Sequence, residues 1–167
     1  MGLRIVEDTV KTDIKIETDV WLEDFLTDLM ELSGMDLQIE ELKLEEETRT
    51  YTARLNGPDK ARAIGRDGQV LEAFQHIAVS AAANSGLVRD RLVVDVDGYR
   101  QRRDESVCED ADRLAHEILE SGGTCDLEPM SPRERRLVHM VISKIDGVTT
   151  ESVGFGDDRF VRLLPSF

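Results

Sequence analysis

The sequence has little cysteine and no long apolar run, and each of these features excludes some classes of protein. Its two cysteines, Cys108 and Cys125, form no C-x-x-C pair, so they indicate neither a disulfide framework nor a metal site. No apolar stretch reaches the length needed to cross a membrane, and the first residues lack the apolar run of a signal peptide. These absences favour a cytoplasmic protein with no direct membrane insertion. The apolar fraction of 40% is enough for folded cores.

The sequence also lacks the motifs of common enzyme classes. It has no G-x-S-x-G nucleophile turn and no G-x-x-x-x-G-K phosphate loop, and its three histidines fall on three separate predicted helices. His116 is followed by Glu117 but by no second histidine at the spacing of a zinc helix. The sequence therefore predicts a protein that is not an enzyme and that uses no metal or other cofactor.

Positive charge is scarce and unevenly distributed. The formal net charge is −14, and residues 1–47 alone hold 15 acidic and 4 basic residues, a net charge of −11. Since nucleic-acid binders usually present a basic surface, the total charge argues against that class. The rest of the chain is nearly balanced and carries its basic residues in small groups, each of which could face a phosphate. These groups are Lys60, Arg62 and Arg66; Arg100, Arg102 and Arg103; and Arg133, Arg135 and Arg136.

Apolar spacing predicts an α+β chain of two small units after a short tail. Residues 1–17 are interpreted as an N-terminal tail with at most one edge strand. Residues 18–97 are expected to form a helix, two antiparallel strands, a short helix, a glycine turn, an amphipathic helix and a third strand. Residues 98–167 are expected to form a long helix, a short strand, a second helix and two more strands. In that second helix, Ser131, Pro132 and Glu134 make the clearest helix start in the chain.

Gly65 and Gly68 bracket two polar residues directly before the amphipathic helix of the first unit. Glycines allow another backbone to approach closely, and a helix start offers unpaired amides to an anion, so the turn suits a sugar-phosphate chain. Asp67 opposes this role because its carboxylate would repel a phosphate. It is placed to cap the helix start instead, which predicts weak and salt-dependent binding.

The order of elements around this turn resembles a type II (prokaryotic) KH domain, in which a Gly-x-x-Gly loop clamps the backbone of about four nucleotides. The resemblance implies close backbone approach at the two glycines, a phosphate contact from Arg66 and an apolar groove wall. For the apolar members, packing in the core is the alternative. The implied RNA-binding residues are Ile64, Gly65, Arg66, Asp67, Gly68, Val70 and Leu71.

Arg135 and His139 lie four residues apart on the predicted helix that begins at Ser131, so they are expected to project together and outward from the apolar face. Residues 127–139 and 147–154 resemble the small domain named for its Arg-x-x-x-His motif. The resemblance implies binding of single-stranded nucleic acid, with Arg135 at a phosphate and His139 at a phosphate or base. We expect Arg133 and Arg136 to reinforce the pair, so that this helix contributes at least as much as the glycine turn.

A KH unit followed at once by an Arg-x-x-x-His unit resembles the bacterial Jag family, also called KhpB, over residues 19–164. Membership implies a cytoplasmic protein that binds single-stranded RNA, with single-stranded DNA as an alternative ligand, and that acts as a post-transcriptional regulator or RNA chaperone. It further implies a small single-KH protein or a second copy as partner. The competing interpretation is a protein-interaction adaptor that docks through its acidic front half and whose nucleic-acid sites are weakened.

Overall fold

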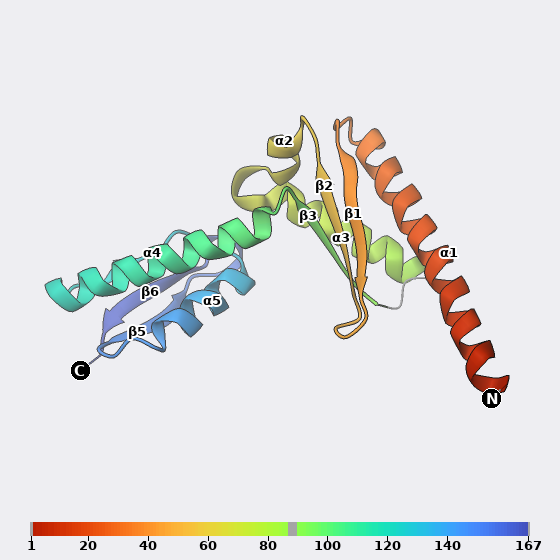
Figure 1. Cartoon of the computed structure of the whole chain (residues 1–167). Coiled ribbons are helices and arrows are strands. Elements are labelled where there is room, and N and C mark those ends of the chain that lie inside the picture. Colours follow the sequence, from red (N-terminus) through yellow and green to blue (C-terminus); the bar gives the residue numbers. More distant parts are fainter. Residues whose placement is uncertain (1, 87–89, 167) are drawn as a thin grey trace. The chain divides into compact units, whose positions relative to one another are not determined.

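The computed structural model describes residues 2–86 and 90–166, with side chains from residue 15 onward in those ranges. The chain divides into two compact units, Met1–Tyr99 and Arg100–Phe167 (Figure 1). Each unit contains one three-stranded sheet packed with helices, so the predicted α+β class is confirmed. Among the helices described, none has both the length and the apolar character that a membrane crossing requires.

The first unit has the order of elements predicted for a KH domain. The central strand of its sheet, β2, pairs antiparallel with β1 and parallel with β3. The elements are α1 (Gly2–Leu32), β1 (Gln38–Glu45), β2 (Thr50–Asn56), α2 (Lys60–Ile64), the 3₁₀ turn η1 (Arg66–Gly68), α3 (Gln69–Ser85) and β3 (Arg91–Val96).

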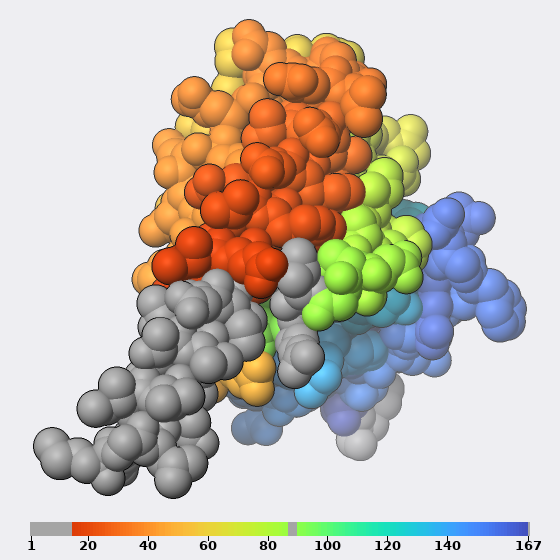
Figure 2. All heavy atoms as spheres, turned by 90° about the vertical axis from the view of Figure 1, so that its right-hand side faces the viewer, coloured from red at the N-terminus to blue at the C-terminus, as the bar shows by residue number. Residues whose placement is uncertain are grey.

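Helices α1 and α3 supply the core of this unit together with one face of the sheet. Leu22 and Leu26 of α1 are fully buried, and so is Leu55 of β2. Figure 2 shows the described part of α1 (red) beside part of α3 (lime green) on one face of the molecule. The α1–sheet–α3 packing leaves the η1 turn at the start of α3 on the outside of the core.

Helix α1 corrects the interpretation of residues 1–17 as a tail with an edge strand. The helix begins at Gly2 and continues without a break to Leu32. Isoleucine, valine and threonine favoured the strand, but β-branched residues cost a helix less than about 1 kcal/mol each. No glycine or proline lies between Leu3 and Ser33 to end the helix, so the weaker local preference is overridden.

The second unit comprises two helices and an antiparallel sheet of order β4-β6-β5. In this sheet Thr150 is opposite Leu163 and Ser152 is opposite Val161. Because directly opposite residues share a face, the two hydroxyl side chains lie on the face that holds the buried Val161 and Leu163. The elements are α4 (Tyr99–Ser121), β4 (Cys125–Asp126), α5 (Pro132–Ile142), β5 (Val148–Val153), the 3₁₀ turn η2 (Gly156–Asp158) and β6 (Phe160–Pro165).

Candidate nucleic-acid interface

Both glycines of the Gly-x-x-Gly turn occupy conformations that a side chain would disturb. Gly65 has φ 72° and ψ −172°, and Gly68 has φ 80°. A Cβ on Gly65 would lie 2.4 Å from Cγ2 of Val70, and one on Gly68 would lie 2.8 Å from Cε1 of Tyr99. The turn is thus closed tightly against Val70 and Tyr99, and both of its ends favour glycine.

Asp67 does not cap α3 as predicted. It adopts φ 53°, Gly68 occupies the N-cap position, and no side chain accepts a hydrogen bond there. The carboxylate instead lies 3.7 Å from Nε of Arg66, whose side chain is 88% exposed. The cap prediction is wrong because the left-handed residue turns the carboxylate away from the helix start and toward its neighbour. The cap position is also shifted by one residue.

The other two cations near this turn are also paired with carboxylates. Lys60 Nζ lies 3.1 Å from Asp97, and Arg62 Nη1 lies 3.0 Å from Asp59. The backbone N–H of Asp36 and the Arg62 guanidinium together lower the pKa of the Asp59 carboxyl. Each basic side chain that the sequence grouped here therefore has an acidic neighbour, which weakens the group's field on a phosphate.

The three apolar residues of the predicted groove differ in burial. Leu71 is 1% exposed and belongs to the core, which is the alternative its helical spacing left open. Ile64 and Val70 are half-buried and pack against that core. Of the three, only these two present apolar surface next to the glycine turn.

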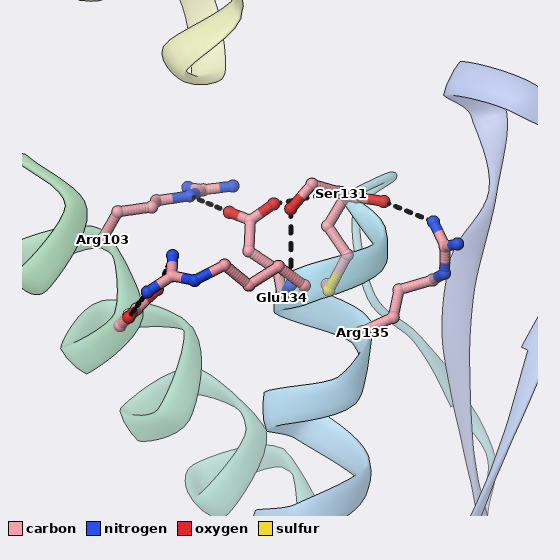
Figure 3. Close-up of polar contacts among 7 residues, drawn as sticks. Arg103, Ser131, Glu134 and Arg135 are labelled. Atoms are coloured by element: carbon pink, nitrogen blue, oxygen red, sulfur yellow. Dashed lines mark hydrogen bonds and ion pairs between the residues drawn. The ribbon is translucent and has the colours of Figure 1, made fainter. Parts of the chain in front are cut away.

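In the second unit, Ser131 begins α5 with a complete capping box, as predicted. Its backbone N–H donates to Oε2 of Glu134 at 2.7 Å, and its hydroxyl accepts from the Glu134 N–H at 3.3 Å (Figure 3). Oε1 of Glu134 also accepts from Nε of Arg103 at 2.8 Å. Burial alone would raise the pKa of this carboxyl, which is 7% exposed, but the bonds from Ser131 and Arg103 outweigh burial and lower it. Glu134 is therefore an ionised anchor between α4 and α5.

Arg135 leaves α5 on the side away from Arg103, toward the sheet (Figure 3). Its Nη1 donates to the Met130 carbonyl at 2.7 Å. Further along α5, the two ring nitrogens of His139 lie 2.6 Å from Oγ1 of Thr150 and 3.0 Å from Oγ of Ser152.

The prediction that Arg135 and His139 point outward is wrong, because both are half-buried and His139 contacts the hydroxyls of β5. The prediction placed the pair too far from the apolar stripe of α5. His139 is adjacent to the buried Val138 and three residues from the buried Ile142, so the pair borders the buried face instead of opposing it.

Arg159, immediately before β6, completes a cluster that the sequence analysis missed. It lies two residues before the buried Val161, on the same sheet face, and its Nε is buried with no hydrogen-bond partner in the described part of the chain. Burial lowers the pKa of His139, and the nearby charges of Arg135 and Arg159 lower it further. At neutral pH the cluster is thus a neutral imidazole flanked by two guanidiniums.

Arg133 and Arg136 differ in availability. Arg133 donates to both carboxylate oxygens of Asp104 and is therefore neutralised. Arg136 is exposed and has no hydrogen-bond or ion-pair partner among the described residues.

Five residues of the second unit form what we call the anion cluster: Arg135, His139, Thr150, Ser152 and Arg159. Period-two alternation along residues 148–152 and 159–163 was the only sequence signal for the last three members. That signal was insufficient without the strand register.

A model of the KhpA/KhpB KH domain matches residues 21–96, and a model of the domain named for the Arg-x-x-x-His motif matches residues 105–165. The fold and the two sites therefore define a protein in which a KH domain is followed by an Arg-x-x-x-His domain. The chain belongs to the KhpB family, and the predicted resemblance is confirmed.

Three relatives illustrate the similarity, and each is named RNA-binding protein KhpB. The protein of Streptococcus pneumoniae serotype 2 (strain D39 / NCTC 7466) is 30% identical over 153 residues, which cover 89% of this chain and 46% of that protein. The Clostridium symbiosum protein is 28% identical over 131 residues, 78% of this chain and 59% of its own length. The Bacillus subtilis (strain 168) protein is 28% identical over 121 residues, 71% of this chain and 58% of its own. The chain thus spans about half the length of the curated relatives it matches.

Proposed function

We propose that this chain binds single-stranded RNA and that its Arg-x-x-x-His unit makes the stronger phosphate contact. The observation that supports this best is the anion cluster, where Arg135 and Arg159 have no carboxylate partner among the described residues. Guanidinium groups bind phosphate oxygens through charge-assisted, often paired hydrogen bonds. The names of the relatives agree with RNA as the ligand.

His139 has a positioning role in this proposal. Both of its ring nitrogens are engaged by the hydroxyls of Thr150 and Ser152, which ties α5 to β5. Each hydroxyl can both donate and accept, so it keeps hydrogen-bonding capacity toward a ligand. A phosphate between the two arginines would meet those hydroxyls, and its charge would favour protonation of the imidazole.

The KH turn contributes a second, weaker contact. Gly65 and Gly68 permit close backbone approach, and Arg66 is open to solvent. Asp67 offsets part of the Arg66 charge, so we expect this clamp to hold RNA mainly when the anion cluster holds the same strand.

The test is the affinity of the whole chain for a short single-stranded RNA at several salt concentrations. Replacing Arg135 with alanine should weaken binding about tenfold or more and reduce the slope of log affinity against log salt by about 1. Arg113→Ala is the matched control, because Arg113 is an exposed arginine of α4 that already pairs with Asp110 and Glu117. RNA binding that is indifferent to both Arg135→Ala and Arg66→Asp would contradict the proposal.

The cellular setting belongs to the same proposal. We expect a cytoplasmic protein without a catalytic step, acting as a post-transcriptional regulator or RNA chaperone and pairing with a small single-KH protein or a second copy. Crosslinking in cells, followed by sequencing of the bound RNA and identification of co-purified protein, tests each part. Recovery of no RNA above a mock purification would contradict it.

One observation favours the alternative of a protein-interaction adaptor. Residues 1–47 have a net charge of −11, and the cations around the KH turn are paired with carboxylates. An adaptor would retain its co-purified protein after Arg66→Asp and Arg135→Ala, and the unmodified chain would bind RNA no better than these variants do.

A further inference from the structure

The connection from β5 to β6 carries an aromatic side chain next to the anion cluster. Phe155 follows Ser152 by three positions, a span of at most about 11 Å. The connection returns through η2 to Arg159, whose N–H donates to the Gly156 carbonyl at 3.4 Å. Both ends of the connection therefore join residues of the cluster.

This connection exposes the side chain of Phe155 to solvent. Its side chain is 93% exposed, the most exposed of the large apolar side chains in the described part of the chain. Gly154 and Gly156 flank it with φ 89° and 56°, and a Cβ on Gly154 would lie only 3.0 Å from the Asp158 carbonyl oxygen. The tight turn thus presents a ring that gains nothing from packing within its own unit, unlike Trp21 and Phe25, which stack on each other with centroids 5.2 Å apart.

We propose that Phe155 stacks on an unpaired base of the RNA strand whose phosphate occupies the anion cluster. The inference rests on the proposed function and adds a base-contacting residue to it. Single-stranded RNA is recognised largely by stacking of splayed bases on aromatic rings, which tolerates any sequence because every base has a flat face. Phe155 is exposed and lies within a few residues of the anion cluster, so it can contact a base of the strand that the cluster holds.

The charges of the connection favour a base over a phosphate at Phe155. Asp157 and Asp158 are exposed in the same turn, and their carboxylates repel a sugar-phosphate backbone. A neutral base is repelled far less by their proximity. The strand is thereby oriented with its phosphates toward Arg135 and Arg159 and a base toward Phe155.

The test compares four proteins on one labelled single-stranded RNA: the unmodified chain, Phe155→Ala, Phe155→Leu and Phe155→Trp. Phe155→Ala and Phe155→Leu should weaken binding about 5- to 100-fold, and Phe155→Trp should preserve it. The salt slope should stay unchanged, because no phosphate contact is removed. The indole introduced by Phe155→Trp should show fluorescence quenching on binding, which gives a direct reading of stacking.

Two controls help to distinguish failure of the stacking inference from failure of the proposed function. Leu32→Ala removes another exposed apolar side chain, 88% exposed in the first unit, and should leave affinity unchanged. A sugar-phosphate oligomer without bases should bind the unmodified chain and Phe155→Ala equally. If Phe155→Ala binds RNA normally while Arg135→Ala does not, the stacking inference is wrong and the proposed function stands. If neither variant changes RNA binding, the stacking inference and the stronger phosphate contact proposed for the Arg-x-x-x-His unit are both wrong.

Discussion

Around the KH turn, Lys60, Arg62 and Arg66 each lie within 3.7 Å of a carboxylate, whereas Arg135 and Arg159 of the Arg-x-x-x-His unit have no acidic partner among the described residues. The two regions have similar numbers of basic residues in sequence. They differ in where the acidic residues point. A motif's attraction for phosphate therefore depends on which of its cations are already paired with carboxylates.

Two carboxylates illustrate the contrast. Asp67 stays at the surface beside Arg66, where it opposes the charge that a phosphate would meet. Glu134 is next to Arg135 in sequence, yet it bonds Arg103 and Ser131 on the other side of α5. The Arg-x-x-x-His unit therefore uses its carboxylate for stability and leaves its arginine to a ligand.

The largest expected effect is the loss of stability caused by replacing Glu134. Glu134→Ala removes the carboxylate that accepts from Arg103 and from the Ser131 N–H at a part-buried site, so the second unit should lose about 2–4 kcal/mol of unfolding free energy. Urea unfolding followed by circular dichroism measures the loss. The emission of Trp21, the only tryptophan, reports on the first unit and should keep its transition. A shift confined to the Trp21 signal would contradict a stabilising role of Glu134 in the second unit.

The same variant has a pH signature. Because the folded pKa of Glu134 is lowered, its stabilisation is present above the unfolded value of about 4.3 and is lost as pH falls through the folded value. The stability gap between the unmodified chain and Glu134→Ala should therefore close in acid. A gap that is constant with pH would mean that packing, and not charge, gives Glu134 its effect.

Gly65→Ala should have the next largest effect, now on the first unit. The residue has φ 72°, and the new Cβ would lie 2.4 Å from Val70, so we expect a loss of about 1–3 kcal/mol. Gly86→Ala is the matched control, since Gly86 has φ 71° but open space around its Cβ. The Trp21 transition should shift more for Gly65→Ala than for Gly86→Ala. Equal shifts would show that the contact with Val70 relaxes without cost.

RNA affinity should depend on pH through His139, and this effect should be smaller. Burial and two arginines lower its pKa in the free protein, and a bound phosphate would raise it again, so binding takes up a proton. Affinity should rise about two- to fivefold from about pH 8 to about pH 6. Calorimetry in buffers of different ionisation enthalpy measures the proton uptake. His139→Gln should abolish it, and uptake that persists in that variant would assign the proton to another group.

The smallest expected effect is on RNA affinity at the KH turn. Asp67→Asn removes the charge beside Arg66, so RNA affinity should increase about 1.5- to 2-fold at low salt. Asp110→Asn, which removes an exposed partner of Arg113, makes the same change in net charge away from the site. An equal gain in both variants would mean that total charge, and not the Arg66–Asp67 pair, limits the KH contact.

The order of elements was predictable because its signals are local. Apolar spacing specified the helices and strands of both units, and Ser131, Pro132 and Glu134 specified where α5 starts, since a capping box involves residues only three apart. The prediction of a tail failed for the same reason. β-Branched residues favour a strand locally, but the helix propagates from its packed part between Trp21 and Met30.

Only two of the five residues of the anion cluster were predictable from the sequence. Arg135 and His139 followed from a motif within one helix, whereas Arg159 joins them only through the pairing of β5 with β6 and the packing of α5 on that sheet. Such contacts depend on strand register, which no short window of sequence contains. The direction of Asp67 was likewise set by a left-handed backbone at a non-glycine residue, which sequence rules treat as uncommon.

The capping box at Ser131 also sets the rotational phase of the anion cluster. Successive residues of an α-helix turn by about 100°, and Ser131 determines the residue at which that count begins. Deleting a single residue between Ser131 and Arg135 would leave every member of the cluster in the chain. The helix would then have to give up either its cap at Ser131 or the rotation that buries Val138 and Ile142 and turns His139 toward Thr150 and Ser152. The spacing from the serine to the cluster therefore matters even though the serine is not a member of it.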